Sequence, residues 1–213
     1  MGRAISSVLW AQGPRILIPT FFVGQKVSSL NNPVEIAQTI AFSFLFVSFA
    51  IVLFSETPWL SLIPGIAAYA YYSMIRDKEN IETYRYSDWI LTTPLMLLAI
   101  LLVNKTSPAL TLGIVLADII MIIAGYLGAK STKESEKMKF FGIGCIAFIP
   151  IIYVLYTMKK AKYAVILTLL LWLLYPTLWY IDEEKIITKD NANISYSVMD
   201  VIAKVGLVNL LHI

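Results

Sequence analysis

The sequence predicts an all-α membrane protein, a seven-transmembrane-helix bundle with a short N-terminal amphipathic segment. Hydrophobic residues make up 58% of the 213 residues and charged residues only 15%, and the mean hydropathy is +0.73. Apolar stretches long enough to cross a hydrocarbon layer of roughly 30 Å recur between short polar breaks. Because backbone groups in lipid must be hydrogen-bonded within one segment, these stretches are expected to be helices and not strands.

Seven apolar spans follow one another along the chain. Before them, the first thirty residues are broken by Gly13-Pro14 and Pro19, which predicts an interfacial segment, residues 1–30, ahead of a helical domain, residues 31–213. Each span except the last ends at a polar stretch typical of a turn or cap. The spans, with the stretch that follows each, are 33–54 (SETP), 59–76 (RDKENIETY), 85–104 (NKTSP), 108–129 (KSTKESEK), 138–158 (KKAK), 162–181 (DEEKIITKDNAN) and 194–213.

Composition excludes several classes of protein. The chain has one cysteine, Cys145, and one histidine, His212, whereas a disulfide framework, a zinc cluster or a Cys/His nucleophilic pair needs several such residues. We therefore predict no metal site and no enzyme. The net charge of +3 is spread over loops of mixed sign, so there is no basic face for nucleic acid. No small-residue cleavage site follows the N-terminal stretch, so we expect no removed signal peptide.

Charged residues inside the spans point to the function. Of 17 basic and 14 acidic side chains, those placed well inside spans are Arg85, Asp88, Asp118, Asp200 and Lys204. Each costs about 2.5–3.5 kcal/mol at mid-helix on insertion scales, so a functional interpretation is the default. Asp200 and Lys204 are one helical turn apart, and a purely structural ion pair is the simpler alternative for these two alone.

The third span, RYSDWILTTPLMLLAI, favours the functional interpretation. It places a cation, an anion and a hydroxyl on one stripe beside Trp89, and Pro94 removes one backbone hydrogen bond in mid-helix. A structural ion pair needs none of these features. A buried cation among them would have a proton affinity set by its neighbours. The stripe residues, at spacings of three and four, are Arg85, Asp88, Thr92, Met96 and Ala99.

The sixth span adds a second aromatic wall in the stretch WLLYPTLWY. Trp172, Tyr175, Pro176 and Trp179 fall at i, i+3, i+4 and i+7. Such a stripe is usually core packing. Together with Trp89, however, it makes a box suited to a long, flat, apolar ligand.

These motifs resemble those of the microbial (type 1) rhodopsins. DVIAKVG, Asp200 to Gly206, is similar to the seventh-helix motif that carries the retinal-bearing lysine, and RYSDWILTTPL, Arg85 to Leu95, is similar to the third-helix motif. The stretch Trp172 to Trp179 matches the sixth-helix motif, ADIIM at 117–121 resembles the fourth helix, and LIPGIAAYAYYSM at 62–74 resembles the second. The resemblance covers about residues 40–213.

The resemblance implies a chromophore and a set of residues that hold it. Lys204 would form a Schiff base with all-trans retinal, Asp88 and Asp200 would be its counterions, and Arg85 and Tyr71 would hold this anionic cluster together. Asp118 would stay protonated near the ring end of the ligand. The polyene would lie between Trp89 and Trp172, and the remaining wall residues would be Tyr175, Trp179, Met121, Gly125, Thr93, Met96 and Phe148.

The same resemblance implies a proton path. Light would change relative proton affinities, so that Asp88, with Thr92 adjacent, accepts the Schiff-base proton. The family's cytoplasmic donor carboxylate would stand at the position of Ala99, and since alanine cannot donate a proton, we predict slow reprotonation from solvent. Glu183 and Glu184 lie in the predicted sixth-to-seventh loop, where the pumps carry release groups; a solvated loop charge is the alternative interpretation.

Four functions follow from these features. A light-driven outward proton pump is favoured by Asp88 and Thr92, whereas a photosensor is favoured by Ala99, because a slow cycle prolongs a signalling state. A light-gated channel, as in some short virus-encoded members that lack the donor, has no row of glutamates in the second span to support it. A retinal-free seven-helix transporter is the alternative from another class.

The expected setting is a lipid bilayer with retinal and protons as partners. The family topology places the N-terminus outside, although the positive-inside count runs four lysines against eight basic residues in the opposite loops. A homo-oligomer is expected, trimer or pentamer.

Overall fold

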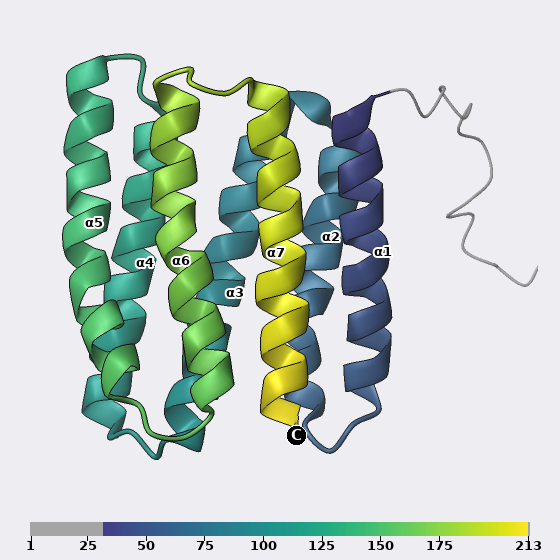
Figure 1. Cartoon of the computed structure of the whole chain (residues 1–213), viewed down its shortest axis with the longest axis vertical. Helices are drawn as coiled ribbons and strands as arrows, with labels where there is room; N and C mark the ends of the chain where they lie inside the picture. Colours follow the sequence, from purple (N-terminus) through teal and green to yellow (C-terminus); the bar gives the residue numbers. More distant parts are fainter. Residues whose placement is uncertain (1–31, 213) are drawn as a thin grey trace, which may run out of the picture. The chain divides into compact units, whose positions relative to one another are not determined.

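The computed structural model describes residues 32–212, and it confirms the predicted all-α bundle (Figure 1). The predicted interfacial segment, residues 1–30, lies outside the described residues. The helices are α1 (Pro33–Leu53), α2 (Leu62–Arg76), α3 (Ile81–Val103), α4 (Pro108–Lys130), α5 (Glu134–Thr157), α6 (Lys162–Glu183) and α7 (Lys189–His212), with short 3₁₀ turns η1 (Pro58–Ser61) and η2 (Lys78–Asn80).

The helices form a closed arrangement that brings α7 back to α1. Each helix from α1 to α5 packs on the next, α6 packs on α7, and α7 contacts α1, α2 and α3. The end with the α3–α4 turn and the α5–α6 loop also holds the end of α7 (Figure 1). This arrangement places the buried stripes of α3 and α7 in contact, and with them the charged residues of both helices.

Six of the seven helices are long and apolar enough to cross a membrane. The exception in the described region is α2, with 15 residues, which η1 precedes directly. Large apolar side chains cover the outside of the bundle; Phe44, Val47, Ile51 and Ile146, for example, are each more than half exposed. An apolar exterior around polar buried groups is the arrangement that a bilayer requires.

The predicted starts of three helices were wrong by four or five residues. Helices α3, α5 and α7 begin at Ile81, Glu134 and Lys189, whereas the apolar spans begin at 85, 138 and 194. Acidic residues in the first turns, such as Glu82 and Glu134, favour these extensions because they complement the positive end of the helix dipole. Hydropathy therefore marks the apolar part of each helix and misses its polar first turn.

Candidate functional site

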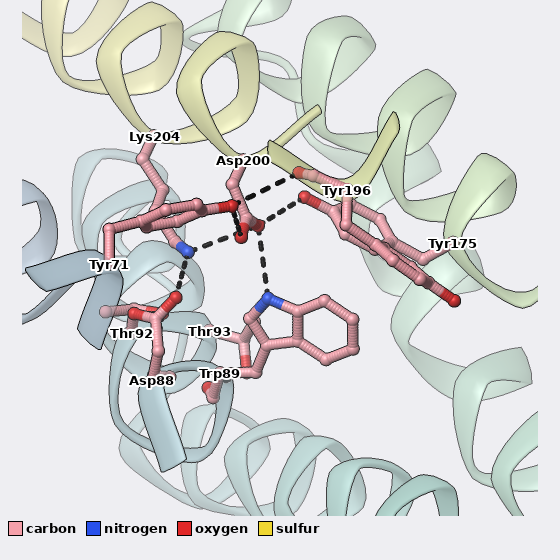
Figure 2. Close-up of polar contacts among 9 residues, drawn as sticks. All are labelled: Tyr71, Asp88, Trp89, Thr92, Thr93, Tyr175, Tyr196, Asp200 and Lys204. Carbon is pink, nitrogen blue, oxygen red and sulfur yellow. Dashed lines mark hydrogen bonds and ion pairs between the residues drawn. The ribbon is translucent and has the colours of Figure 1, made fainter. Parts of the chain in front are cut away.

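Lys204 lies at the centre of the buried polar groups. Its side chain is 1% exposed, and its Nζ lies 2.5 Å from Asp88 Oδ2 and 3.2 Å from Asp200 Oδ1 (Figure 2). Asp88 comes from α3 and Asp200 from the preceding turn of α7. Two carboxylates against one ammonium leave one negative charge in this cluster, so the site is built to keep a cation at Nζ.

Asp200 is held by three donors from three other helices. Tyr71 OH of α2 donates to Oδ2 at 2.8 Å, whereas Trp89 Nε1 of α3 and Tyr175 OH of α6 donate to Oδ1 at 3.1 and 2.7 Å (Figure 2). These donors stabilise a carboxylate and fix its orientation. The sequence predicted the proximity of Tyr71 and Asp200, but it placed Tyr175 only in the ligand wall.

Asp88 has fewer donors than Asp200. Besides Lys204, its side chain accepts a hydrogen bond from Thr92 Oγ1, at 3.2 Å to Oδ1, and the same hydroxyl lies 2.9 Å from the Asp88 carbonyl oxygen. Thr92 is one turn along α3, as the stripe predicted. Because a proton on Asp88 would break fewer hydrogen bonds than one on Asp200, the two carboxylates are chemically unequal.

Arg85, which the resemblance implied would help to hold the anionic cluster together, contacts two residues of α7. Its guanidinium donates to Asn193 Oδ1 at 2.6 Å and lies over the Tyr196 ring, 4.2 Å from the ring centre; among the described residues it forms no hydrogen bond to Asp88 or Asp200. Sequence reasoning missed Asn193, which precedes the predicted start of the seventh span at residue 194, and also Tyr196, which lies inside that span. Their spacings from Asp200, seven and four residues, were the available signal.

An apolar pocket opens beside Lys204 among α3, α4, α5, α6 and α7. Its empty volume, including open space at its mouth, is about 880 Å³. The predicted residues that line it are Trp89, Thr93, Met96, Met121, Gly125, Phe148, Trp172, Tyr175, Trp179, Asp200 and Lys204. The structure therefore brings these predicted residues together around one pocket.

Helix α5 supplies the part of the wall that was missed. Phe140, Phe141, Gly144 and Cys145 also line the pocket, and the Phe141 ring stacks on Trp179 with centroids 4.9 Å apart. These residues belong to an apolar helix without a charged motif. Their spacings from Phe148, three, four, seven and eight residues, were the only signal, and such spacings are common to any buried helical face.

Asp118 is buried behind the pocket wall. It does not line the pocket; its Oδ2 accepts a hydrogen bond of 2.8 Å from Thr93 Oγ1, and its Oδ1 has no partner among the described residues. Thr93 does line the pocket, so Asp118 reaches it only through this hydroxyl.

Ala99 lies in an apolar core cluster. It is 2% exposed and belongs to a core cluster with Leu97, Ile100, Leu207 and Val208, among others. This cluster fills the interior between Lys204 and the end with the α5–α6 loop. Thr168 is an exceptional polar group there, because it is 1% exposed and its hydroxyl has no partner among the described residues.

The Glu183 carboxylate forms an ion pair. Glu183 is the last residue of α6 rather than a loop residue, and its carboxylate binds the Lys137 ammonium of α5. Lys189 of α7 lies 2.7 Å from Glu82 and 2.9 Å from Asp182, so ion pairs connect α3, α5, α6 and α7 at this end. Glu184, which caps α6, is exposed.

Comparison with known proteins gives one family. Residues 34–213 match the family model described as "Bacteriorhodopsin-like protein". Archaerhodopsin-2 of Halobacterium sp. (strain aus-2) is 31% identical over 173 residues, which cover 68% of this chain and 66% of that protein. Sensory rhodopsin I of Haloarcula marismortui is 29% identical over 170 residues, covering 70% of this chain and 72% of that protein.

Solved structures agree with the sequence comparison. The crystal structure of the proton pumping rhodopsin AR2 from the marine alga Acetabularia acetabulum superposes with a TM-score of 0.77 and 26% identity, covering 84% of this chain and 92% of that one.

The match to archaerhodopsin-2 spans slightly less than two thirds of that relative's length.

Proposed function

Because the chain belongs to the family of bacteriorhodopsin-like proteins, the microbial rhodopsins, we propose that it binds retinal at Lys204 and acts as a light-driven outward proton pump. A single observation carries this proposal: Lys204 Nζ is buried between two carboxylates, and an apolar pocket lined by aromatic side chains begins at the same residue. Similar proteins include a proton pumping rhodopsin and a sensory rhodopsin. Proton pumping and light sensing are therefore the two functions to compare for this chain.

The residues present fit retinal. The pocket wall is mostly apolar, with Lys204 and Asp200 at one end and Thr93 as a further polar side chain, so it suits a polyene with one reactive end. Retinal joined to Nζ as an imine would supply visible absorption and, in the all-trans form that we propose, a light-driven isomerisation. Lys204 would anchor it, and Trp89, Trp172 and Trp179 would hold its apolar body.

Asp88 is the proposed proton acceptor. Its Oδ2 lies 2.5 Å from Nζ, which is within direct proton-transfer distance, whereas Asp200 is engaged by three donors that stabilise its negative charge. The proton on Nζ would therefore pass to Asp88 Oδ2 while Asp200 remains the permanent counterion. Thr92, already bonded to Oδ1, would hold the protonated carboxyl in place.

Return of a proton to Nζ is proposed to be slow. No carboxylate stands at Ala99, and the surrounding core cluster is apolar, so water enters this half only at a cost. Solvent would supply the proton directly. The same observation favours the second candidate, a photosensor, because a long-lived deprotonated state serves signalling.

The release side is proposed to differ from the sequence-based prediction. Since Glu183 pairs with Lys137, it is poorly placed to store a proton, and exposed Glu184 is the better candidate of the two for a release group. We further propose the family topology, with the N-terminus outside, and a homo-oligomer.

One experiment separates the candidate functions. Cells that express the chain with added retinal are illuminated in an unbuffered suspension, with and without an uncoupler. Acidification of the medium that the uncoupler abolishes is the expected result. A current that reverses with voltage would indicate a channel, neither response would favour a sensor, and absence of a visible band would favour the retinal-free transporter.

A further inference from the structure

One end of the bundle carries four exposed lysines that form no ion pair with a described residue, although the loop between α1 and α2, which contains exposed Glu56, lies at the same end (Figure 1). Lys105 lies in the α3–α4 turn, and Lys159, Lys160 and Lys162 lie in or directly after the α5–α6 loop; we call these four residues the lysine surface. Neither 104–107 nor 158–162 contains an aspartate or glutamate.

Asn104 joins the two loops into one surface. Its Oδ1 accepts hydrogen bonds from the backbone N–H groups of Lys159 and Lys160, at 3.1 and 2.8 Å, and its Nδ2 donates to the Lys160 carbonyl at 3.2 Å. Thr106 adds a contact of 3.9 Å to the Met158 sulfur. The like charges of this surface are thus held near one another although they repel.

At the opposite end of the bundle, several lysines form ion pairs with acidic side chains of the chain itself. Lys78 pairs with Glu35, Lys133 with Glu136, and Lys189 with Glu82 and Asp182. The opposite end therefore mixes paired lysines with acidic side chains, whereas the four lysines of the lysine surface form no ion pair with a described residue and are available to anions from outside.

Exposed tyrosines place the lysine surface relative to the bilayer. Tyr156, in the last turn of α5, is 80% exposed, and Tyr163, in the first turn of α6, is 76% exposed. Tyrosines on the outside of a membrane protein concentrate at the level of the lipid headgroups, where the ring contacts hydrocarbon and the hydroxyl contacts water. The neighbouring lysines therefore lie at headgroup level, where phosphate anions are abundant.

We propose that the lysine surface, held together by Asn104, binds the headgroups of anionic phospholipids. Each lysine near a negatively charged membrane surface contributes an attraction that fades within a Debye length. Cooperation among several lysines on one rigid surface would enrich anionic lipid there relative to zwitterionic lipid. A free phosphate ion has the same charge chemistry but lacks the anchoring acyl chains.

The test compares matched triple variants of the full chain. Lys105→Gln/Lys159→Gln/Lys160→Gln removes three charges from the lysine surface and leaves the backbone groups that bind Asn104. Lys130→Gln/Lys139→Gln/Lys185→Gln removes three exposed lysines without ion pairs from the other end. Each protein is reconstituted in phosphatidylcholine vesicles containing spin-labelled phosphatidylglycerol or spin-labelled phosphatidylcholine, and the protein-associated fraction of each label is measured.

The original chain should prefer phosphatidylglycerol, and the lysine-surface variant should lose this preference by about threefold or more, while the control variant keeps it. Equal loss in both variants, or no preference in the original chain, would overturn the proposal. So would displacement of the labelled lipid by inorganic phosphate beyond that caused by sodium chloride at equal ionic strength. Monodispersity and helix content check that each variant folds. The lipid measurement itself requires neither bound retinal nor pumping, so it is independent of the proposed function.

Discussion

At the scale of single residues, two aspartates beside one lysine have different surroundings. Asp200 accepts hydrogen bonds from Tyr71, Trp89 and Tyr175, and Asp88 accepts from Thr92 besides its contact with Lys204. The sequence predicted both carboxylates, because charged residues in apolar spans are rare. It could not predict their inequality, which depends on donors that four helices bring together.

Substitution of Asp88 by asparagine should shift the visible band to longer wavelength and abolish deprotonation of Nζ, because the nearer negative charge and the acceptor are both lost. Absorption spectra and flash photolysis measure the two effects. A deprotonated intermediate formed at the normal rate in D88N would remove Asp88 as acceptor.

Replacement of Lys204 by alanine should abolish pigment formation, since no other described lysine lines the pocket. The measurement is the visible spectrum after addition of retinal, with helix content as the folding control. Undiminished colour in K204A would refute the anchor.

Thr168→Val should raise the melting temperature. The Thr168 hydroxyl is buried without a partner among the described residues, and removal of such a group at nearly constant volume gains on the order of 1 kcal/mol, or about 2–4 °C for a chain of this size. Thr93→Val is the control, since its hydroxyl bonds to Asp118 and its loss should lower stability. Equal destabilisation of both variants would mean that Thr168 has a partner.

At the scale of the helix, α3 carries opposite environments on successive turns. Its residues from Arg85 to Thr92 contact polar groups, whereas Met96 to Leu101 pack in the apolar core cluster. Spacing in the sequence predicted that these residues share a face. The change from a polar to an apolar environment along that face was predictable only at Ala99. At that position the family has a carboxylate, and this sequence has an alanine.

Ala99→Asp should accelerate recovery of the photocycle, because it places a proton donor in the apolar half. Flash photolysis at several pH values measures the recovery rate, and azide added to the original chain is the parallel test. Recovery unchanged by either would show that the missing carboxylate is not the cause of a slow cycle.

The ion pairs at the ends of α3, α5, α6 and α7 give a second helix-scale prediction. Lys189 is partly exposed, so each of its pairs contributes at most about 1 kcal/mol after screening by solvent. Lys189→Gln should therefore lower the melting temperature by a few degrees in low salt, and less in high salt. Lys185→Gln is the matched control and should have no effect, because Lys185 is exposed and forms no ion pair with a described residue.

At the scale of the whole molecule, the seven-helix prediction was confirmed, because recurring apolar spans and the requirement for internal hydrogen bonding leave few alternatives. The family resemblance was confirmed as well. Contacts such as that of Arg85 with Asn193, or of Phe141 with Trp179, were not predictable, since they depend on how the helices rotate against one another.

The proposed topology places Glu184 outside the cell and Lys160 inside. In a Cys145→Ser background, a cysteine at position 184 should react with a membrane-impermeant maleimide in intact cells, and one at position 160 only after permeabilisation. Both native side chains are exposed, so both positions are accessible. The reverse labelling pattern would invert the topology.

The position of Lys204 on α7 has a consequence for biosynthesis. The ribosome makes α7 after α1 to α6, yet the pocket wall comes from α3 to α7 and the donors to Asp200 come from as early as α2. The proposed chromophore can therefore be attached only after α7 has packed against the earlier helices. In the folded apoprotein, Asp88 and Asp200 pair with the Lys204 ammonium, so no unpaired ammonium lies in the bilayer interior before the proposed chromophore is attached.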